Sequence, residues 1–326
     1  MSTTRRVFLA AACSMPFVAR AAAPRRPLDL IFFPCNLGLR PPSPGVEPGT
    51  WRAPEVLDKA GLSAGLHPAH VARLARRPYS PDPDRGSKVR NGTALRAYLV
   101  ELCAEVERSF GRGAFPVVIG GDCSTLLGGL LALRRRGGRG LVHIDGHSDF
   151  FHPGNHDYSK MPGAAAGMDL AFATGRGEPV LARWEGVTGP LVEDADVVQI
   201  GERYDIDDPT IYPDLSKTAV ERVPVQTFKS AGVAATAARV VARLAERKLD
   251  RAWMHIDLDV LDESIMKAVD SPGSPGLTYE ELAALGRALV GSGRIAGMNV
   301  SIYDPDLDPD GHTARDIVAC LASMLS

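Results

Sequence analysis

The sequence has little net charge, few aromatic residues and no long apolar run. Its 326 residues include 37 Lys and Arg against 39 Asp and Glu, so the formal net charge is −2. Proteins that bind nucleic acids usually carry a basic surface that neutralises phosphates, and this balance indicates no such partner. Hydrophobic residues make up 45% of the chain, which is ample for a buried core. The composition predicts a globular protein that acts on a small molecule.

Cysteine is also scarce, and its spacing implies no disulfide framework. Beyond residue 23 the chain contains only Cys35, Cys103, Cys123 and Cys320, which are far apart and form no CxxC pair. Cys103 falls within an amphipathic helical pattern, so we expect it to be a small core residue. Cys123 differs from the others because it follows a short apolar run and lies beside an aspartate.

The first 23 residues resemble an export signal. Arg5 and Arg6 precede a small-residue apolar stretch that ends in three alanines at 21–23. Paired arginines in this position are typical of a twin-arginine leader, which exports proteins that have already folded. The stretch is too short and too rich in alanine to span a membrane. We therefore expect a periplasmic protein with one domain over residues 24–326 and no membrane association once the leader is removed.

Short apolar runs alternate with helical patterns along the rest of the chain. The runs predict strands at residues 28–33, 116–119, 141–144, 197–200, 222–225, 253–256 and 298–302. The helical patterns lie at residues 93–110, 124–135, 233–247, 279–290 and from 313 towards the C-terminus. This alternation favours an α/β fold in which helices cover both faces of a mainly parallel sheet.

Residues that commonly bind metals follow three of the predicted strands. In chain order they are Cys123; Asp145, His147 and Asp149; and Asp257 and Asp259. The carboxyl ends of parallel strands meet at one edge of a sheet, so we expect these side chains to lie together. If the backbone after residue 144 stays extended, the alternating positions of Asp145, His147 and Asp149 point them to the same side.

The concentration of carboxylates predicts a metal centre. Several carboxylates at the end of a buried strand would repel one another unless protons or a cation neutralised them. Five carboxylate and imidazole ligands exceed what one catalytic ion normally takes from a protein, which favours two divalent ions. We expect Asp145 and Asp257 to bridge the two ions. The other ligands would be His147 and Asp259 for one ion, and Cys123 and Asp149 for the other.

Three motifs resemble those of the ureohydrolases, the family of arginase, agmatinase and formiminoglutamase. They are GGDCS at 120–124, HIDGHSDF at 143–150 and HIDLDVLDESIMKAVDSPGSPGLTYEEL at 255–282. The resemblance extends from about residue 28 to the end of the chain. It implies a three-layer α/β/α arginase-like fold, a binuclear manganese site and a homo-oligomer. It also implies that Asp149 is catalytic, because this position matches the carboxylate that handles the proton of the metal-bridging water.

The sequence departs from the family pattern at one metal ligand. Cys123 stands where most members have a histidine. A thiolate is a softer ligand than imidazole, so zinc, iron or nickel become alternatives to manganese. A different interpretation is that Cys123 is an inert buried thiol beside a weakened ion site, because free cysteine is often simply buried.

Two further departures affect substrate binding. The segment at 160–168 resembles the one where an arginase has its catalytic His-Gly pair, but it contains no histidine. In the segment at 299–305, Ser301 or Ile302 stands where arginases have a glutamate that binds the guanidinium group. We expect substrate contacts from His156, Ser159 and Ser301, and we expect arginine to be a poor substrate.

The predicted reaction is hydrolysis of a C–N bond in a linear amidine or guanidino-type small molecule, by attack of a metal-bridging hydroxide on a trigonal carbon. Two alternatives use the same site. One is a metal-dependent amide deacetylase, for which the missing histidine and glutamate matter less. The other is a metal-binding homologue without catalytic activity, since a fold and a site do not guarantee turnover.

Overall fold

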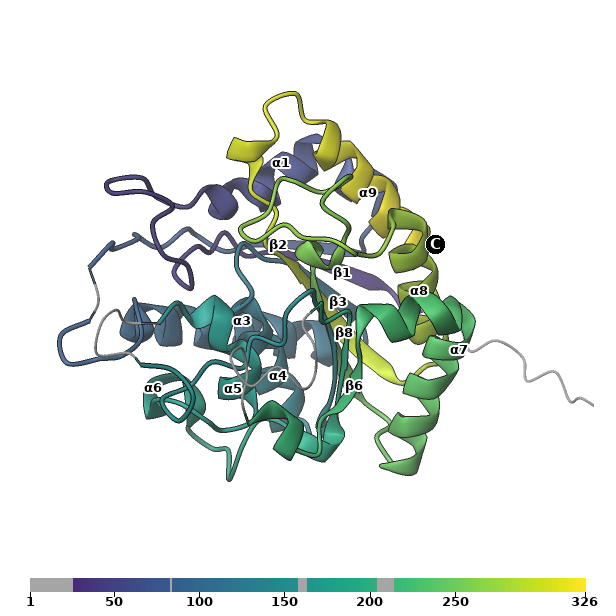
Figure 1. Cartoon of the computed structure of the whole chain (residues 1–326). Coiled ribbons are helices and arrows are strands. Elements are labelled where there is room, and N and C mark those ends of the chain that lie inside the picture. The colour runs from purple at the N-terminus through teal and green to yellow at the C-terminus, as the bar shows by residue number, and fades with distance from the viewer. Residues whose placement is uncertain (1–25, 83, 158–162, 204–213) are drawn as a thin grey trace, which may run out of the picture.

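Eight parallel strands form one sheet at the centre of the molecule (Figure 1). The computed structural model describes residues 26–82, 84–157, 163–203 and 214–326. The predicted export signal and Ser159 lie outside these residues. The strands are β1 (Leu28–Phe32), β2 (His70–Arg73), β3 (Phe115–Ile119), β4 (Gly140–Ile144), β5 (Val197–Ile200), β6 (Glu221–Val223), β7 (Ala252–Asp257) and β8 (Ile295–Ser301). Their order across the sheet is β2-β1-β3-β8-β7-β4-β5-β6.

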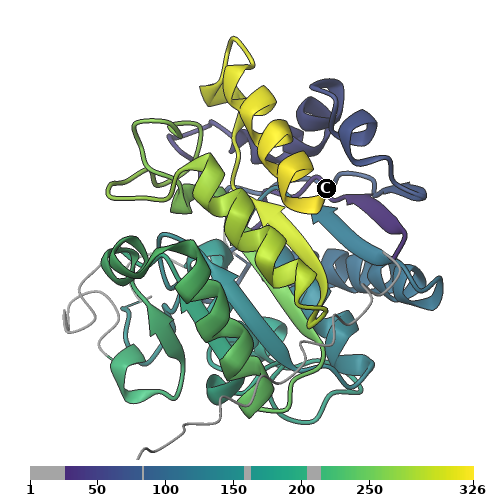
Figure 2. The same ribbon diagram turned by 90° about the vertical axis from the view of Figure 1, so that its right-hand side faces the viewer.

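Helices cover both faces of this sheet. The α-helices are α1 (Ala53–Lys59), α2 (Leu62–Leu66), α3 (Gly92–Gly111), α4 (Thr125–Arg135), α5 (Asp169–Ala173), α6 (Pro179–Ala182), α7 (Val225–Glu246), α8 (Tyr279–Gly291) and α9 (His312–Leu325). Short 3-10 helices are η1 (Gly49–Arg52), η2 (Ala165–Met168), η3 (Asp194–Asp196), η4 (Leu215–Lys217), η5 (Leu258–Val260) and η6 (Pro305–Leu307). Helices α3 to α6 lie on one face, and α1, α2 and α7 to α9 lie on the other (Figure 2).

Burial on both faces explains why the central strands contain nearly continuous apolar runs. Every residue of β3, β4, β5, β7 and β8 is buried. Alternate side chains enter two separate cores, one beneath α3 and α4 and one beneath α7 to α9. Trp253, for example, packs on the α4 side, whereas its neighbour Met254 packs on the α8 side. The result is a rigid three-layer support for the loops at the strand ends.

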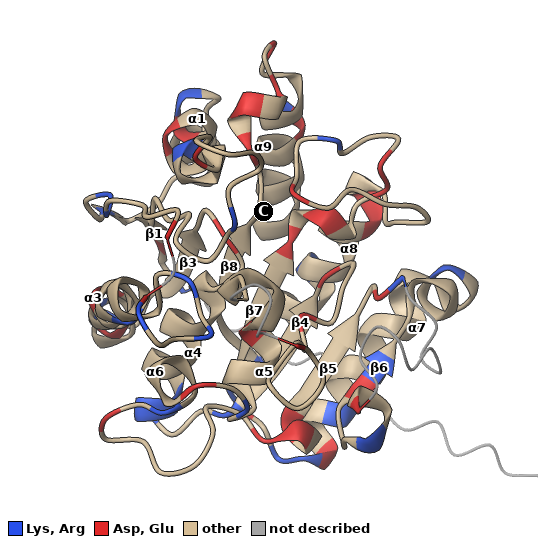
Figure 3. Ribbon diagram, turned by 60° about the vertical axis from the view of Figure 1, so that its left-hand side comes forward, with Lys and Arg blue, Asp and Glu red and all other residues tan. Residues whose placement is uncertain are grey.

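The observed architecture confirms the predicted α/β/α fold, and all seven predicted strands are present. The prediction missed β2, an edge strand whose residues are mostly exposed and which therefore has no apolar pattern. Gly232 interrupts α7 with φ 80° and ψ 169°, so its second part begins at the predicted residue 233. No helix within the described ranges is both long and apolar enough for a membrane crossing. Basic and acidic residues are intermingled on the surrounding helices and loops (Figure 3).

Candidate metal centre and substrate pocket

The predicted ligands lie at the carboxyl ends of three strands near the middle of the sheet. β7 is hydrogen-bonded to β4 on one side and to β8 on the other, and β8 is followed by β3. Asp145 comes directly after β4, and Asp257 is the last residue of β7. Cys123 lies in the tight connection between β3 and α4. Because these strands are parallel, all three connections open on the same edge of the sheet.

The backbone after β4 bends, so the prediction of an extended chain at 145–149 is wrong. The strand ends at Ile144, and residues 146 and 147 form a bend. Asp145 Oδ1 accepts a hydrogen bond of 2.6 Å from the backbone N–H of His147. Asp149 has a φ of 44°, in the left-handed region that aspartate tolerates better than most residues. A local turn, and not strand alternation, therefore brings Asp145, His147 and Asp149 together.

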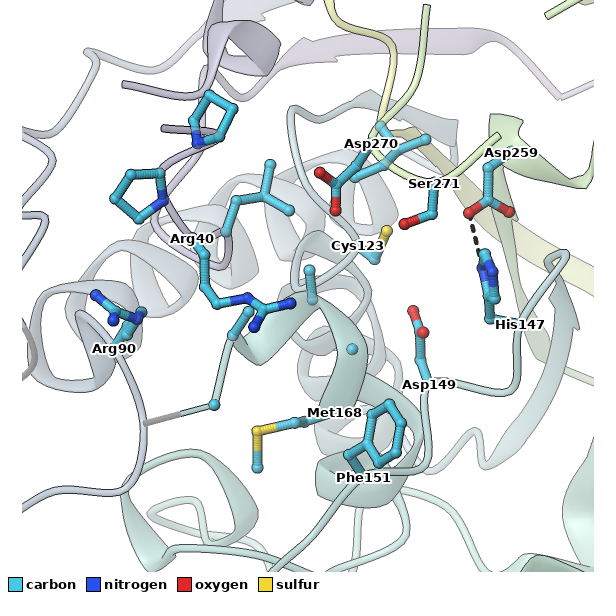
Figure 4. A pocket seen from close by; sticks show the side chains of 18 of the residues that line it. Arg40, Arg90, Cys123, His147, Asp149, Phe151, Met168, Asp259, Asp270 and Ser271 are labelled. Carbon is cyan, nitrogen blue, oxygen red and sulfur yellow. Dashed lines mark ion pairs between the residues drawn. The ribbon is translucent and has the colours of Figure 1, made fainter. Parts of the chain in front are cut away.

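Hydrogen bonds connect this turn to the loop after β7. Asp257 Oδ1 accepts a 2.7 Å hydrogen bond from the N–H of Asp259. This hydrogen bond caps the N-terminus of the one-turn helix η5. Asp259 Oδ1 accepts a 3.1 Å hydrogen bond from the N–H of Gly146. The other oxygen of Asp259 lies 2.8 Å from His147 Nδ1, which is the ion pair drawn in Figure 4. The two acidic motifs thus hold each other in position.

Their side chains form two overlapping groups of potential metal ligands. One group comprises Asp145, His147 and Asp259, and the other comprises Asp145, Asp149 and Asp257. Within each group, one ligand atom per residue lies within 4.8 Å of the others. Two neighbouring cations that share the Asp145 carboxylate would fit this arrangement, as carboxylate-bridged ions do in binuclear hydrolases.

The electrostatics of the cluster also fit a bound cation. Burial raises the pKa of Asp149 and Asp257 well above the usual value, and the neighbouring carboxylates raise it further. Burial lowers the pKa of His147, but the adjacent Asp259 outweighs this and raises it to about 9. One oxygen of Asp145, Oδ2, is buried and has no hydrogen-bond partner in the described part of the chain. A divalent ion would neutralise these charges and supply the missing partner.

Cys123 lies beside this cluster and is 2% exposed. Its thiol donates a hydrogen bond to Asp257 Oδ2 over 2.6 Å. Burial raises the pKa of the thiol well above 9.0, and the Asp257 carboxylate raises it further. A metal that binds Cys123 must therefore displace a proton, so its affinity should increase with pH. The contact with Asp257 places Cys123 next to the cluster, and its role as a ligand stays a prediction.

A row of buried polar residues beneath the cluster was missed by the sequence analysis. Gln199, His143, His255 and Asn299 are paired in register across β5, β4, β7 and β8. All four are 0% exposed. A signal was available, because each histidine stands two residues before the first aspartate of its motif and shares that strand face. Asp169, the first residue of α5, covers this row, with its Oδ1 3.3 Å from His143 Nε2.

Hydrogen bonds determine which nitrogen of His255 carries its proton. Trp253 Nε1, which can only donate, gives a 2.8 Å hydrogen bond to Asn299 Oδ1. The amide nitrogen of Asn299 then faces His255 Nδ1 at 2.8 Å, so Nδ1 must accept. The proton of the neutral ring is therefore at Nε2, 3.8 Å from an Asp145 oxygen. His255 also lies near Cys123 and Asp257. In this tautomer it supports the ligands electrostatically and cannot itself bind a metal through Nε2.

A cavity of about 760 Å³ lies above the ligand cluster (Figure 4). Cys123, His147, Asp149, Asp257 and Asp259 form part of its lining. Other walls come from distant segments, namely 39–44 after β1, 163–168 around η2, and 270–271 before α8. A small molecule that enters this cavity reaches the predicted metal ligands directly.

Of the predicted substrate-binding residues, one lines the cavity, one does not, and one lies outside the described residues. His156 lines the cavity, and its ring centroid lies 5.1 Å from that of Phe151. Ser301 is 2% exposed at the end of β8 and is not part of the lining, whereas its neighbour Ile302 is. Ser159 lies outside the described residues. The upstream histidine His152 is turned towards Asp214, with Nε2 2.7 Å from a carboxylate oxygen. We also expected the loop 150–167 to form one wall of the pocket, and of its described residues Phe151, His156, Gly163, Ala164, Ala166 and Gly167 line the cavity.

Comparisons with known proteins agree with this geometry. The Arginase family model matches residues 46–326. The chain belongs to the arginase family. Arginase from Bacillus caldovelox is 28% identical over 306 residues, which cover 92% of this chain and 98% of that protein. Human Arginase-1 is 25% identical over 301 residues, covering 91% and 89% of the two chains. The family resemblance of the three motifs is therefore confirmed.

Solved structures of family members have the same fold. The Bacillus caldovelox arginase structure superimposes with a TM-score of 0.78 at 26% identity, covering 92% of this chain and 98% of that one. The proclavaminate amidino hydrolase of Streptomyces clavuligerus has a TM-score of 0.66 at 20% identity, with 93% of each chain covered. The second comparison supports the fold alone.

Within this family fold, apolar residues occupy two walls where polar groups were expected. Ala166 and Gly167 line the cavity in the segment that should carry the His-Gly pair. Ile302 lines it beyond β8, where the family's glutamate was expected. Ile302 has a φ of 77°, which is strained for a β-branched residue, and its N–H donates a 2.7 Å hydrogen bond to Gly121. The fold thus holds an apolar side chain in this wall at some energetic cost.

Replacement of Cys123 tests whether it is a ligand. Cys123→Ala should reduce the bound metal from two ions to one, whereas Cys123→His should keep two and bind manganese at least about tenfold more tightly. Imidazole is a harder ligand than thiolate, which is the reason for this order. Metal content and manganese titrations would measure it. Cys103→Ala is the matched control, because Cys103 is also buried but lies in α3. Equal metal binding by all variants would make Cys123 a packing residue.

Proposed function

We propose that this chain hydrolyses a C–N bond in a linear amidine or guanidino-type small molecule and that it uses two divalent metal ions. Manganese is the metal we propose, and zinc, iron and nickel are the alternatives. The observation that carries the proposal is the pair of ligand groups that share Asp145 at the floor of a cavity of about 760 Å³. Membership of the arginase family supports it. A buried acidic cluster without an open cavity would instead suggest a purely structural ion.

The chemistry divides between the ions and the protein. When bound, the two ions would acidify water and stabilise the negative charge that develops on the substrate. Asp149 lines the cavity and is 8% exposed, so one carboxylate oxygen can reach a water molecule there. It would orient that water towards the trigonal carbon and accept its proton. His147 and Asp259 would keep the remaining ligand geometry through their 2.8 Å contact.

A release assay tests the proposal. The purified protein would be stripped with a chelator, reloaded with manganese or zinc, and given guanidino, amidino, formimino and N-acetyl compounds. We expect urea or ammonia release from at least one linear amidine, only after metal reloading. Acetate release alone would favour a metal-dependent amide deacetylase. Two bound ions without hydrolysis of any compound would favour a non-catalytic metal-binding homologue.

L-arginine itself should be a poor substrate. Ala166 and Ile302 line the walls where the family's catalytic histidine and guanidinium-binding glutamate were expected. Loss of a few kcal/mol of transition-state stabilisation corresponds to at least about a hundredfold loss of rate. We therefore expect kcat/KM for arginine, measured by urea release with manganese, below about 10⁴ M⁻¹s⁻¹. A higher value would mean that other residues replace both groups fully.

We also propose that residues 1–23 direct export of the folded protein to the periplasm. Arg5 and Arg6, followed by the small-residue apolar stretch, support this. Cell fractionation of the full chain and of an Arg5→Lys, Arg6→Lys variant would test it. Retention of only the variant in the cytoplasm is expected, and equal periplasmic yields would contradict the proposal.

A further inference from the structure

Arg203 reaches the ligand cluster from β5, the strand next to β4. It follows the end of β5, and its side chain is 8% exposed. Its backbone N–H donates a 3.1 Å hydrogen bond to the carbonyl oxygen of Gly146, which stands between the predicted ligands Asp145 and His147. A nearly buried cation therefore lies against the turn that carries these ligands, and the proposed reaction assigns it no role.

The guanidinium of Arg203 holds the loop after β7 by three backbone carbonyl groups. Its Nη2 donates to the carbonyl oxygen of Asp259 and, over 3.1 Å, to that of Leu261. Its Nε donates over 3.2 Å to the carbonyl oxygen of Pro275, in the segment before α8. A guanidinium is planar and presents its donors in a fixed fork, so these hydrogen bonds define the orientation of the loop as well as its distance. The backbone of Asp259 is thus held from the side of β5.

The same guanidinium also faces the side chain of Asp259. Its Nη1 lies 3.9 Å from Asp259 Oδ1, is buried, and has no hydrogen-bond partner among the described residues. Asp259 Oδ1 accepts a hydrogen bond from the Gly146 N–H, and its other oxygen lies 2.8 Å from His147 Nδ1. A cation at this distance attracts the carboxylate and offsets part of the negative charge of the cluster. Arg203 therefore acts on both the backbone and the side chain of one predicted ligand.

Gly146 leaves the space that the guanidinium fills. A Cβ atom at residue 146 would overlap Nη1 of Arg203. The backbone of Gly146 is not in the left-handed region, so the lack of a side chain here serves the contact and not an unusual conformation. Because three carbonyl groups hold the guanidinium in a nearly buried place, a side chain at residue 146 would have to displace it.

We infer that Arg203 is a positioning residue for one of the two ions. Its guanidinium holds Asp259, and through Asp259 also His147, in the arrangement in which both can bind that ion. In the described ranges Arg203 forms no hydrogen bond or ion pair with Cys123 or Asp149, the ligands expected for the other ion. Loss of the guanidinium should therefore affect the two ions unequally. This inference deepens the proposed function and rests on the metal centre that the function requires.

Manganese titration of the chelated protein tests the inference without turnover. Arg203→Met should weaken one ion about tenfold to a hundredfold, the range typical when a residue that supports a metal ligand is lost, and should leave the other within about threefold. At a manganese concentration that fills the wild type, electron paramagnetic resonance should then show a single Mn(II) ion in place of a coupled pair. Loss of both ions from the folded variant, or of neither, would overturn the inference.

Gly146→Ala provides a second variant that keeps the arginine. Its Cβ atom should displace the guanidinium and weaken the same ion at least about tenfold. In the Arg203→Met background the same substitution should change the affinity by less than about twofold, because the guanidinium that it would overlap is absent, and such non-additivity is expected of residues in contact. Additive losses, or wild-type manganese binding by Gly146→Ala, would contradict the inference. The second result decides even if Arg203→Met does not fold.

Arg222 provides a matched control for the loss of a buried arginine. Its side chain is 6% exposed in β6, at the edge of the sheet beyond β5, and forms a 3.4 Å ion pair with Glu202. Arg222→Met should lower thermal stability and yet keep both ions at wild-type affinity. Selective loss of the same ion in Arg222→Met would mean that the effect is not specific to Arg203, and the inference would fall.

The metal titrations separate this inference from the proposed function. If the manganese-loaded wild type hydrolyses none of the compounds in the release assay, but Arg203→Met loses one ion selectively, then the proposed function fails and the inference stands. If the wild type hydrolyses a linear amidine with two ions bound, and Arg203→Met binds both ions as tightly, then the proposed function stands and the inference fails.

Discussion

Asp145→Ala and Asp257→Ala are expected to lose metal and hydrolytic activity together. Asp145 belongs to both ligand groups, and Asp257 belongs to one of them and also contacts Cys123. Without Asp145, two neighbouring ions would lose the ligand common to both groups, and without Asp257 one ion would lose a ligand beside Cys123. We expect kcat/KM to fall at least about a thousandfold, which corresponds to about 4 kcal/mol of transition-state stabilisation. Metal content by mass spectrometry and ammonia or urea release would be measured on the same samples.

A control at the other end of the same strand distinguishes a ligand effect from a general loss of stability. Asp250 precedes β7, and its side chain is 90% exposed beside Arg294. Asp250→Asn should keep both ions and full activity. Circular dichroism would show whether the alanine variants remain folded, and Asp257→Asn keeps the side-chain volume. Two bound ions and wild-type turnover in Asp145→Ala would rule out its role as the shared ligand.

The metal-free protein should lose stability as the pH rises from about 5 to about 8. Burial raises the pKa of Asp149 and Asp257 well above the unfolded value of about 3.9, and neighbouring carboxylates raise it further. A folded state that holds protons more tightly is favoured at low pH, so this contribution declines as the pH rises above about 4 towards the folded pKa values. His147, with a pKa of about 9, has the same sign, and its contribution is lost between about 6.5 and 9.

Thermal unfolding of chelated protein at several pH values would measure this effect. Each kcal/mol should lower Tm by about 2 to 4 °C in a protein of this size class. The manganese-loaded protein should show a much flatter dependence, because the cations take the place of the protons. Asp149→Asn with Asp257→Asn should reduce the slope, since an amide does not titrate, and the remainder should come from His147, Asp169 and Glu202, whose pKa is also raised. Stability of the chelated wild type that rises with pH would contradict the electrostatic account.

Much of the predicted metal centre could be derived from local sequence patterns. Apolar runs of four to six residues predicted the buried strands, and a parallel sheet requires that their carboxyl ends share one edge. Asp145 and Asp257 each stand at the end of such a run, so both were expected at that edge, but their closeness depends on β4 and β7 being neighbours in the sheet. The path of the backbone after β4 was harder to predict, because the turn at residues 146–147 depends on a hydrogen bond from the His147 N–H to the Asp145 carboxylate.

The substrate pocket could not be derived in the same way. Arg40 and Asp270 are 230 residues apart in numbering and belong to loops without periodic patterns, so their common cavity depends on how those loops pack over the sheet. Ser301 and Ile302 are adjacent in sequence, but only Ile302 lines the cavity, because the backbone turns to a φ of 77° there. Neighbouring positions at a strand end cannot be assigned to a wall until that turn is known.

The buried histidines show the same division between sequence and tertiary structure. The chemical types of the ligands and the strand that carries each are properties of the local sequence, since apolar runs and acidic motifs are local patterns. That His143 pairs with His255, and His255 with Asn299, depends on the register of β4, β7 and β8. Register is decided by packing between segments distant in sequence, because a shift by one residue would move each side chain to the other face of the sheet.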